Sequence, residues 1–98
     1  MLFIVQFEDD PSKLDVRQQW LPAHVEFLDR NRDRILVPGS LREPATDRPV
    51  GGLWIVDAPD EAAVKALFAD DPFWVHGLRA GYRIHRWHKA FPDRRVPI

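Results

Sequence analysis

The chain contains no cysteine among its 98 residues. This absence excludes disulfide bonds, thiolate nucleophiles, and zinc or iron–sulfur sites built on cysteine. Long apolar runs are absent too: the N-terminal segment at residues 2–7 is apolar for only about six residues, whereas a membrane helix needs roughly 20. No basic stretch precedes it, as a secretory signal would require. We therefore expect a soluble, cytoplasmic protein with no membrane partner.

A strong net charge is also missing, since the formal net charge is −1. The charge is uneven, however: residues 79–98 hold six Lys or Arg and a single acidic residue. Such a basic strand and tail can attract nucleic acid. Outward-facing arginines on a strand explain the pattern more simply, and no RNA-recognition signature is present. The sequence therefore argues against a nucleic-acid partner.

Hydrophobic patterning predicts one domain over residues 1–98, with residues 92–98 as a C-terminal tail. The β-rich apolar runs predict strands, and the spacing of Trp20, His24, Phe27 and Leu28 puts these four side chains on one helix face. The predicted strands cover residues 2–7, 34–41, 53–58 and 81–91, and the predicted helices cover residues 12–32 and a segment that begins after Asp57 or Asp60 and ends before Pro72.

Pro22 interrupts the first predicted helix, because proline cannot donate the expected backbone hydrogen bond and its ring crowds a carbonyl. Two outcomes are open. The helix either kinks there, or a new helix begins near Leu21 with Pro22 in its first turn. In the second case His24 lies in the first turn, where the positive end of the helix dipole favours the neutral, proton-accepting imidazole.

The element order β-α-β-β-α-β predicts an α+β, ferredoxin-like fold with a four-stranded antiparallel sheet and two helices on one face. Pro38 in the second strand favours a sheet edge or a bulge. The other sheet face is left bare, and we expect it to expose Trp54, Trp87, Phe91 and alternate residues of the first strand. Exposed apolar patches of this kind usually mark an interface. We therefore predict a two-fold homodimer formed sheet face against sheet face.

The two helices run antiparallel in this fold, so the end of the second helix at Asp71 lies near His24. A carboxylate that accepts a hydrogen bond from one imidazole nitrogen leaves the other nitrogen free to act as a general base. This pattern puts Asp71 at a helix C-terminus, where an anion needs compensation by a nearby His24 or arginine. His85 and His88 point to opposite faces of their strand, so we predict no metal site, and nothing indicates a cofactor.

Several short motifs carry a resemblance to a known family, and they occur in the same order along the chain. They are RQQWLPAHVEFL, ILVPGSL, ADDPFWVHGL and RIHRWHKAF. Together they resemble the YciI-like (YCII-related) family of small bacterial proteins from Phe3 to about Phe91. That family is similar in architecture to the dimeric α+β barrels, which include muconolactone isomerases and small monooxygenases. The resemblance departs at Ser40, where the family often has proline in a Gly-Pro-Leu stretch.

The resemblance implies a His–Asp active site at His24 and Asp71. We expect proton transfer, of isomerase or lyase type, on a small cyclic or carbonyl-containing metabolite. The predicted ligand-binding side chains are Arg17, Trp20, Ser40, Arg42, Phe73 and Trp74. The alternative is a homodimer that binds a small molecule without catalysis, and sequence alone does not separate the two. Turnover of a substrate would.

Overall fold

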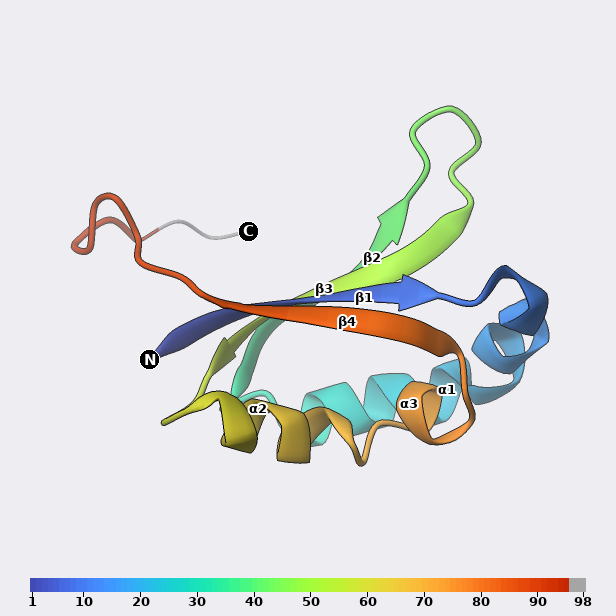
Figure 1. The fold of residues 1–98 in the computed structure, drawn as a ribbon, viewed down its shortest axis with the longest axis horizontal. Helices are drawn as coiled ribbons and strands as arrows, with labels where there is room; N and C mark the ends of the chain where they lie inside the picture. The colour runs from blue at the N-terminus through green and yellow to red at the C-terminus, as the bar shows by residue number, and fades with distance from the viewer. Residues whose placement is uncertain (96–98) are drawn as a thin grey trace.

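The computed structural model describes residues 1–95 and shows four antiparallel strands with helices on one face of the sheet (Figure 1). The strand order is β2-β3-β1-β4, which confirms the ferredoxin-like arrangement. The strands are β1 (Leu2–Asp9), β2 (Ile35–Arg42), β3 (Pro49–Asp57) and β4 (Arg79–Arg86), and the helices are η1 (Pro11–Lys13), α1 (Leu14–Arg30), α2 (Glu61–Phe68) and α3 (Pro72–Val75).

The main core lies between the sheet and the helices. On β1, Phe3, Val5 and Phe7 alternate toward the helices and are buried, as the two-residue period of a strand requires. Trp54 pairs with Val5 across the ladder and shares their face, where its ring packs edge-on against Phe7. The prediction that Trp54 belongs to the bare face was therefore wrong. Adjacent residues of β3 are all apolar, so alternation alone did not show which set points inward.

The helix α1 is continuous through Pro22. A separate 3-10 turn precedes it, and the helix proper begins at Leu14 rather than at Pro22. Of the two outcomes left open at Pro22, the fresh helix near Leu21 is therefore excluded, and His24 lies in the middle of α1, far from the N-terminal dipole. Its position is set by packing: His24 is buried on the same side of α1 as Phe27.

The second helix ends earlier than the sequence pattern indicated. Asp60 caps α2 by accepting a hydrogen bond from the Ala63 N–H at 2.8 Å, and the helix stops at Phe68. A second short helix, α3, then begins at Pro72, a residue that suits a first helical turn. Asp71 is the N-cap of α3 and not the end of α2, so our placement of this carboxylate at a helix C-terminus was wrong.

The edges of the sheet follow the sequence more closely. β2, which carries Pro38, is an edge strand, and its pairing with β3 contains an irregularity between Ile35 and Val37. β4 ends at Arg86, five residues before the predicted end, although the Trp87 N–H still bonds to the Leu2 carbonyl. Of the predicted tail, residues 96–98 lie outside the described part of the chain. No helix of the described residues is long and apolar enough to cross a membrane.

Candidate active site

His24 and Asp71 form a buried hydrogen-bonded pair between α1 and the start of α3. The Nδ1 atom of His24 lies 2.7 Å from Oδ1 of Asp71, and the two side chains are 10% and 1% exposed. The same Oδ1 accepts the Phe73 backbone N–H at 3.1 Å, so this oxygen acts as an acceptor and His24 Nδ1–H donates to it. This arrangement leaves Nε2 of His24 for a ligand.

The Phe73 ring packs against one face of the His24 imidazole and fixes the plane of that imidazole. Its ring stacks on His24 with centroids 3.8 Å apart and an interplanar angle of 12°. Phe73 is completely buried, in a small apolar cluster with Val16 and Leu78 that joins α1, α3 and the start of β4. Phe73 orients His24 and is itself fixed by packing in this cluster. The position of the imidazole is therefore set before any ligand binds.

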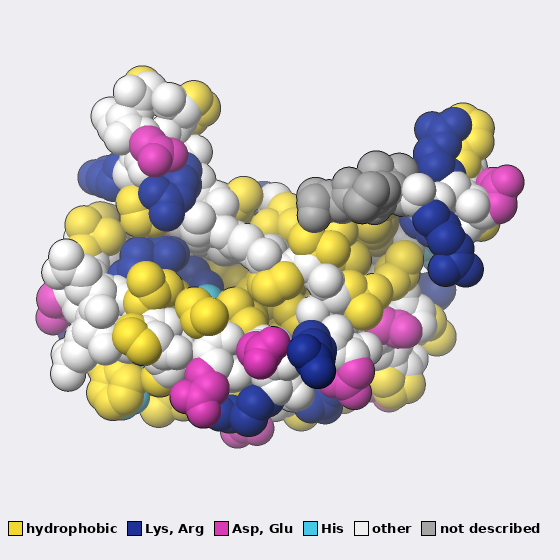
Figure 2. All heavy atoms as spheres, turned by 180° about the vertical axis from the view of Figure 1, so that it is seen from behind, with side chains coloured by type: hydrophobic (Ala, Val, Ile, Leu, Met, Phe, Trp, Pro, Cys, Tyr) yellow, Lys and Arg dark blue, Asp and Glu magenta, His cyan; other side chains and the backbone are white. Residues whose placement is uncertain are grey.

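A cavity of about 240 Å³ opens above His24, between α1 and the edge strand β2. Its walls are of two kinds, basic and apolar. It is lined by Arg17, Leu21, His24, Val25, Leu28, Pro38, Gly39, Ser40, Arg42, Gly51 and Arg79. Figure 2 shows Lys and Arg atoms gathered below the β2–β3 hairpin, with a histidine and hydrophobic side chains next to them. A hollow with both kinds of wall suits a small apolar ring that carries a negative charge.

Two of the cavity arginines are held from behind by one buried carboxylate. Oδ2 of Asp9 lies 2.6 Å from Arg17 Nη2, and Oδ1 lies 2.6 Å from Arg79 Nη1. Burial lowers the pKa of Arg79, and the charges of Asp9 and Asp71 act in the opposite direction. The carboxylate that holds His24 therefore also belongs to the electrostatic surroundings of Arg79.

Three of the six predicted ligand-binding side chains line the same cavity as His24, namely Arg17, Ser40 and Arg42. Arg42 Nε donates to the Ser40 hydroxyl at 3.0 Å, which gives a role to the hydroxyl that departs from the family pattern. Among residues 1–95, no group of three or more His, Asp or Glu side chains is placed to hold a metal ion.

The other three predicted side chains do not line the cavity. Phe73 lies beneath the imidazole and has no exposed surface. Trp74 packs against Phe68 in the main core, and Trp20 stacks on His76 with ring centroids 3.7 Å apart. Their nearness in sequence to the site suggested pocket walls, but the short helix α3 turns Trp74 away from His24.

Sequence reasoning missed Arg79 and Asp9. Arg79 was grouped with the outward-facing arginines of the last strand, yet its side chain is only 2% exposed and lines the cavity. The predicted first strand ends at residue 7, before Asp9, whereas β1 continues through Asp9 and pairs it with Arg79 in the ladder. One signal in the sequence could have indicated this ion pair. It is the acidic residue at the end of one apolar strand together with the arginine at the start of another.

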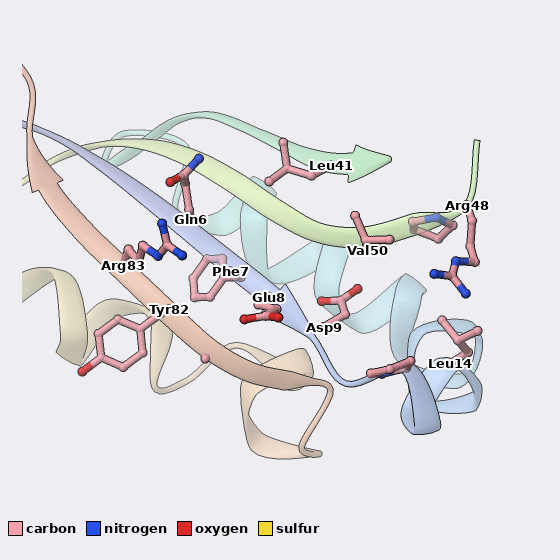
Figure 3. Close-up of a pocket in the computed structure, with 13 residues that line it drawn as sticks. Gln6, Phe7, Glu8, Asp9, Leu14, Leu41, Arg48, Val50, Tyr82 and Arg83 are labelled. Atoms are coloured by element: carbon pink, nitrogen blue, oxygen red, sulfur yellow. The ribbon is translucent and has the colours of Figure 1, made fainter. Parts of the chain in front are cut away.

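A larger cavity of about 610 Å³ lies on the opposite, bare face of the sheet and contains neither His24 nor Asp71. Gln6, Glu8, Leu41, Val50 and Arg83 are among the side chains drawn around it in Figure 3. The bare face also carries Ile4, Leu53 and Ile55, which the pairing of β1 with β3 places side by side. It is a mixed surface, apolar in its centre and polar toward β4.

The model of the YCII-related domain matches residues 1–88 of the chain. This chain belongs to the YCII-related domain family. The predicted family resemblance is thus confirmed over nearly the whole length of this YCII-related protein. No curated protein matched it.

Two solved structures place the YCII-related protein among its neighbours. It is 29% identical, with a TM-score of 0.82, to a 5-chloro-2-hydroxyhydroquinone dehydrochlorinase from Burkholderia phenoliruptrix, in complex with 2,5-dihydroxybenzoquinone; the match covers 90% of this chain and 94% of that one. That enzyme belongs to the dimeric α+β barrel superfamily. A second neighbour, a putative antibiotic biosynthesis monooxygenase from Bacteroides thetaiotaomicron, is 22% identical with a TM-score of 0.59 over 99% of this chain and 95% of that one. The second likeness concerns the fold alone.

Proposed function

We propose that this YCII-related protein is a small enzyme of lyase or isomerase type that moves a proton on a small, anionic, cyclic metabolite. The observation that carries the proposal is the buried His24–Asp71 pair, whose imidazole lines a cavity that also has three arginines and several apolar side chains in its wall. The similar dehydrochlorinase supports a lyase-type reaction, since its name describes the removal of HCl. Its structure holds a hydroxylated ring, which supports a cyclic ligand.

In the proposed reaction, Nε2 of His24 takes a proton from a ring hydroxyl or an adjacent C–H group. The electron pair left behind moves into the ring. A ring carbon then takes the proton back, which gives the keto tautomer and completes an isomerisation. Where that carbon carries chlorine, Nε2 takes the proton of a second ring hydroxyl, the electron pair of that O–H bond forms a second carbonyl, and chloride departs with its bonding electrons to leave a quinone. Asp71 keeps Nδ1–H in place and stabilises the imidazolium that forms. This chain's own residues thus supply the base, its orientation and the charge of the pocket.

The test is turnover of a chlorinated hydroxyhydroquinone, followed by chloride release and by the absorbance of the quinone product. We expect His24→Ala and Asp71→Asn to lower kcat by about 10²- to 10⁴-fold, the usual contribution of a positioned acid–base group. His88→Ala is the matched control, because His88 is exposed and lies outside the cavity. If the wild-type protein binds the ring compound but never releases chloride or isomerises it, the non-catalytic binding reading replaces the enzyme.

We further propose that two copies associate through the bare sheet face to form the barrel. The centre of this face holds the half-buried apolar side chains Ile4, Leu53 and Ile55. The similar dehydrochlorinase belongs to the barrel superfamily, and this supports the same geometry for the dimer. Sedimentation should give twice the 11.4 kDa chain mass. Ile55→Glu, which puts a charge in the middle of the face, should shift the protein toward the monomer; a monomeric wild type at high concentration would contradict this.

A further inference from the structure

Arg79 differs from the other arginines of β4 because its guanidinium is buried beside the proposed active site. The side chain is 2% exposed, it lines the His24 cavity, and only one of its terminal nitrogens bonds to Asp9. Its Nε atom, like that of Arg17, is buried without a hydrogen-bond partner among the described residues. The bond to Asp9 uses Nη1 and leaves Nη2, and a guanidinium at a cavity wall with a terminal nitrogen left over is a strong donor for an anion.

The Gly51–Gly52 pair makes room for this arrangement. A Cβ atom on Gly52 would lie 3.0 Å from Nη2 and 3.4 Å from Nη1 of Arg79, so any larger residue would push the guanidinium aside. Nη2 of Arg17 meanwhile donates to the Gly51 carbonyl at 3.3 Å. The glycine pair is part of β3 and lies against the two guanidinium groups.

The charges around the cavity limit what can bind. Arg17, Arg42 and Arg79 line it, and none of the described residues that line it is acidic. Asp9 and Asp71 lie behind this wall, Asp47 forms an exposed ion pair with Arg42 at 3.4 Å, and the three carboxylates offset part of the positive charge. The volume of about 240 Å³ falls below the roughly 300–1,000 Å³ of sites for drug-sized ligands. The space therefore fits one ring with a single negative charge.

We propose that Arg79, held by Asp9 and given room by Gly52, is the anion-binding residue of the cavity, and that the ligand is a one-ring phenolate, enolate or carboxylate. This inference rests on the proposed function for the site but deepens it, since it assigns the ligand class and a residue that binds it. In the proposed reaction, the negative charge left when Nε2 of His24 takes a proton develops against Arg79 and Arg17. Because both are fixed beforehand, no reorganisation is needed at that moment.

The test measures binding by titration calorimetry, which requires no turnover. The probes are 2,5-dihydroxybenzoquinone and benzoate, with benzamide as the uncharged counterpart of benzoate. We expect wild-type protein to prefer benzoate over benzamide, and Arg79→Gln to lose about 10- to 100-fold in affinity for both anions, as the loss of a charge-assisted hydrogen bond implies. Arg86→Gln is the matched control, because Arg86 lies on the same strand but is exposed and away from the cavity.

Gly52→Ala provides a second variant that keeps every charge and displaces the guanidinium of Arg79, although the new Cβ would also lie 3.3 Å from the Gly39 carbonyl oxygen. We expect it to weaken anion binding by about 3- to 10-fold while the melting temperature shows a folded protein; if Arg79→Gln does not fold, this variant decides. Unchanged anion affinity in the folded variants, or no binding of either anion to wild type, would overturn the inference. Arg79-dependent binding without any turnover would instead refute only the proposed enzyme activity.

Discussion

The Asp9 carboxylate offers the sharpest prediction about stability, because it is the common partner of two buried cations. It binds Arg17 and Arg79 at 2.6 Å each, and the side chains of Asp9 and Arg79 are both 2% exposed. Asp9→Asn keeps the shape but removes the charge, so Arg79 remains as a buried cation that has lost its ion-pair partner and keeps only the more distant charge of Asp71. Breaking such a pair costs about 3–5 kcal/mol, a large part of the roughly 5–15 kcal/mol that stabilises a domain.

Urea unfolding followed by tryptophan fluorescence, to which the buried Trp54 contributes, measures this loss of unfolding free energy directly. At about 4–8 °C per kcal/mol for a chain of this size, the melting temperature should fall by at least about 12 °C. The control is Glu26→Gln, which breaks an exposed pair with Arg30 four residues along α1 and should cost no more than about 0.5 kcal/mol. A loss of less than about 1 kcal/mol in Asp9→Asn would refute the reasoning, since the arginines would then be solvated without their partner.

Three further outcomes follow from the described contacts. Gly51→Ala should cost about 1–3 kcal/mol or more in urea unfolding, because its Cβ would lie 2.1 Å from a carbonyl oxygen of β1, whereas Gly39→Ala, with nothing within 4 Å, should be nearly neutral. Asp71→Ala should lower the free energy of unfolding by about 2–4 kcal/mol, since it removes both the cap of α3 and the hydrogen bond to the imidazole. Asp71→Asn keeps a side-chain oxygen for the cap and should lose less, so an equal loss in the two variants would contradict a stabilising role for that oxygen. Hydrogen bonds from Ser12 lower the pKa of Asp10 below 3.8, so Asp10 stabilises the fold above that pH and the contribution disappears as the pH falls through the folded-state value. The backbone N–H of residue 12 makes the larger contribution and is retained in Ser12→Ala, which removes only the hydroxyl donor. This variant should therefore raise the NMR-measured Asp10 pKa part of the way, and an unchanged value would exclude the Ser12 hydroxyl as a cause.

Much of the fold could be predicted from the sequence because the strands carry apolar runs that few other structures accommodate. The order of elements, the edge position of the strand with Pro38 and the cap at Asp60 all rest on local rules. The inward face of β3 could not be predicted, because Leu53, Trp54 and Ile55 are all apolar. Only the pairing of Trp54 with Val5 decides it.

The site was predicted in part for a similar reason. Topology brings α1 and the segment after α2 together, so the contact of His24 with Asp71 followed from the element order. The short helix α3 was not foreseen, and it places Phe73 beneath the imidazole instead of in the cavity wall. The Asp9–Arg79 pair joins residues 70 positions apart, and a long-range contact of this kind leaves no periodic signal in the sequence.

The central claim is that Asp71 holds His24 as the tautomer whose Nε2 is free to accept a proton. The most direct measurement is ¹⁵N NMR of the neutral His24 imidazole in the wild type and in Asp71→Asn, with the resonance assigned from a His24→Gln sample. We predict a proton on Nδ1 and none on Nε2 in the wild type, and a clear change in both nitrogen shifts in Asp71→Asn. A wild-type ring protonated on Nε2, or identical shifts in the two proteins, would contradict the account.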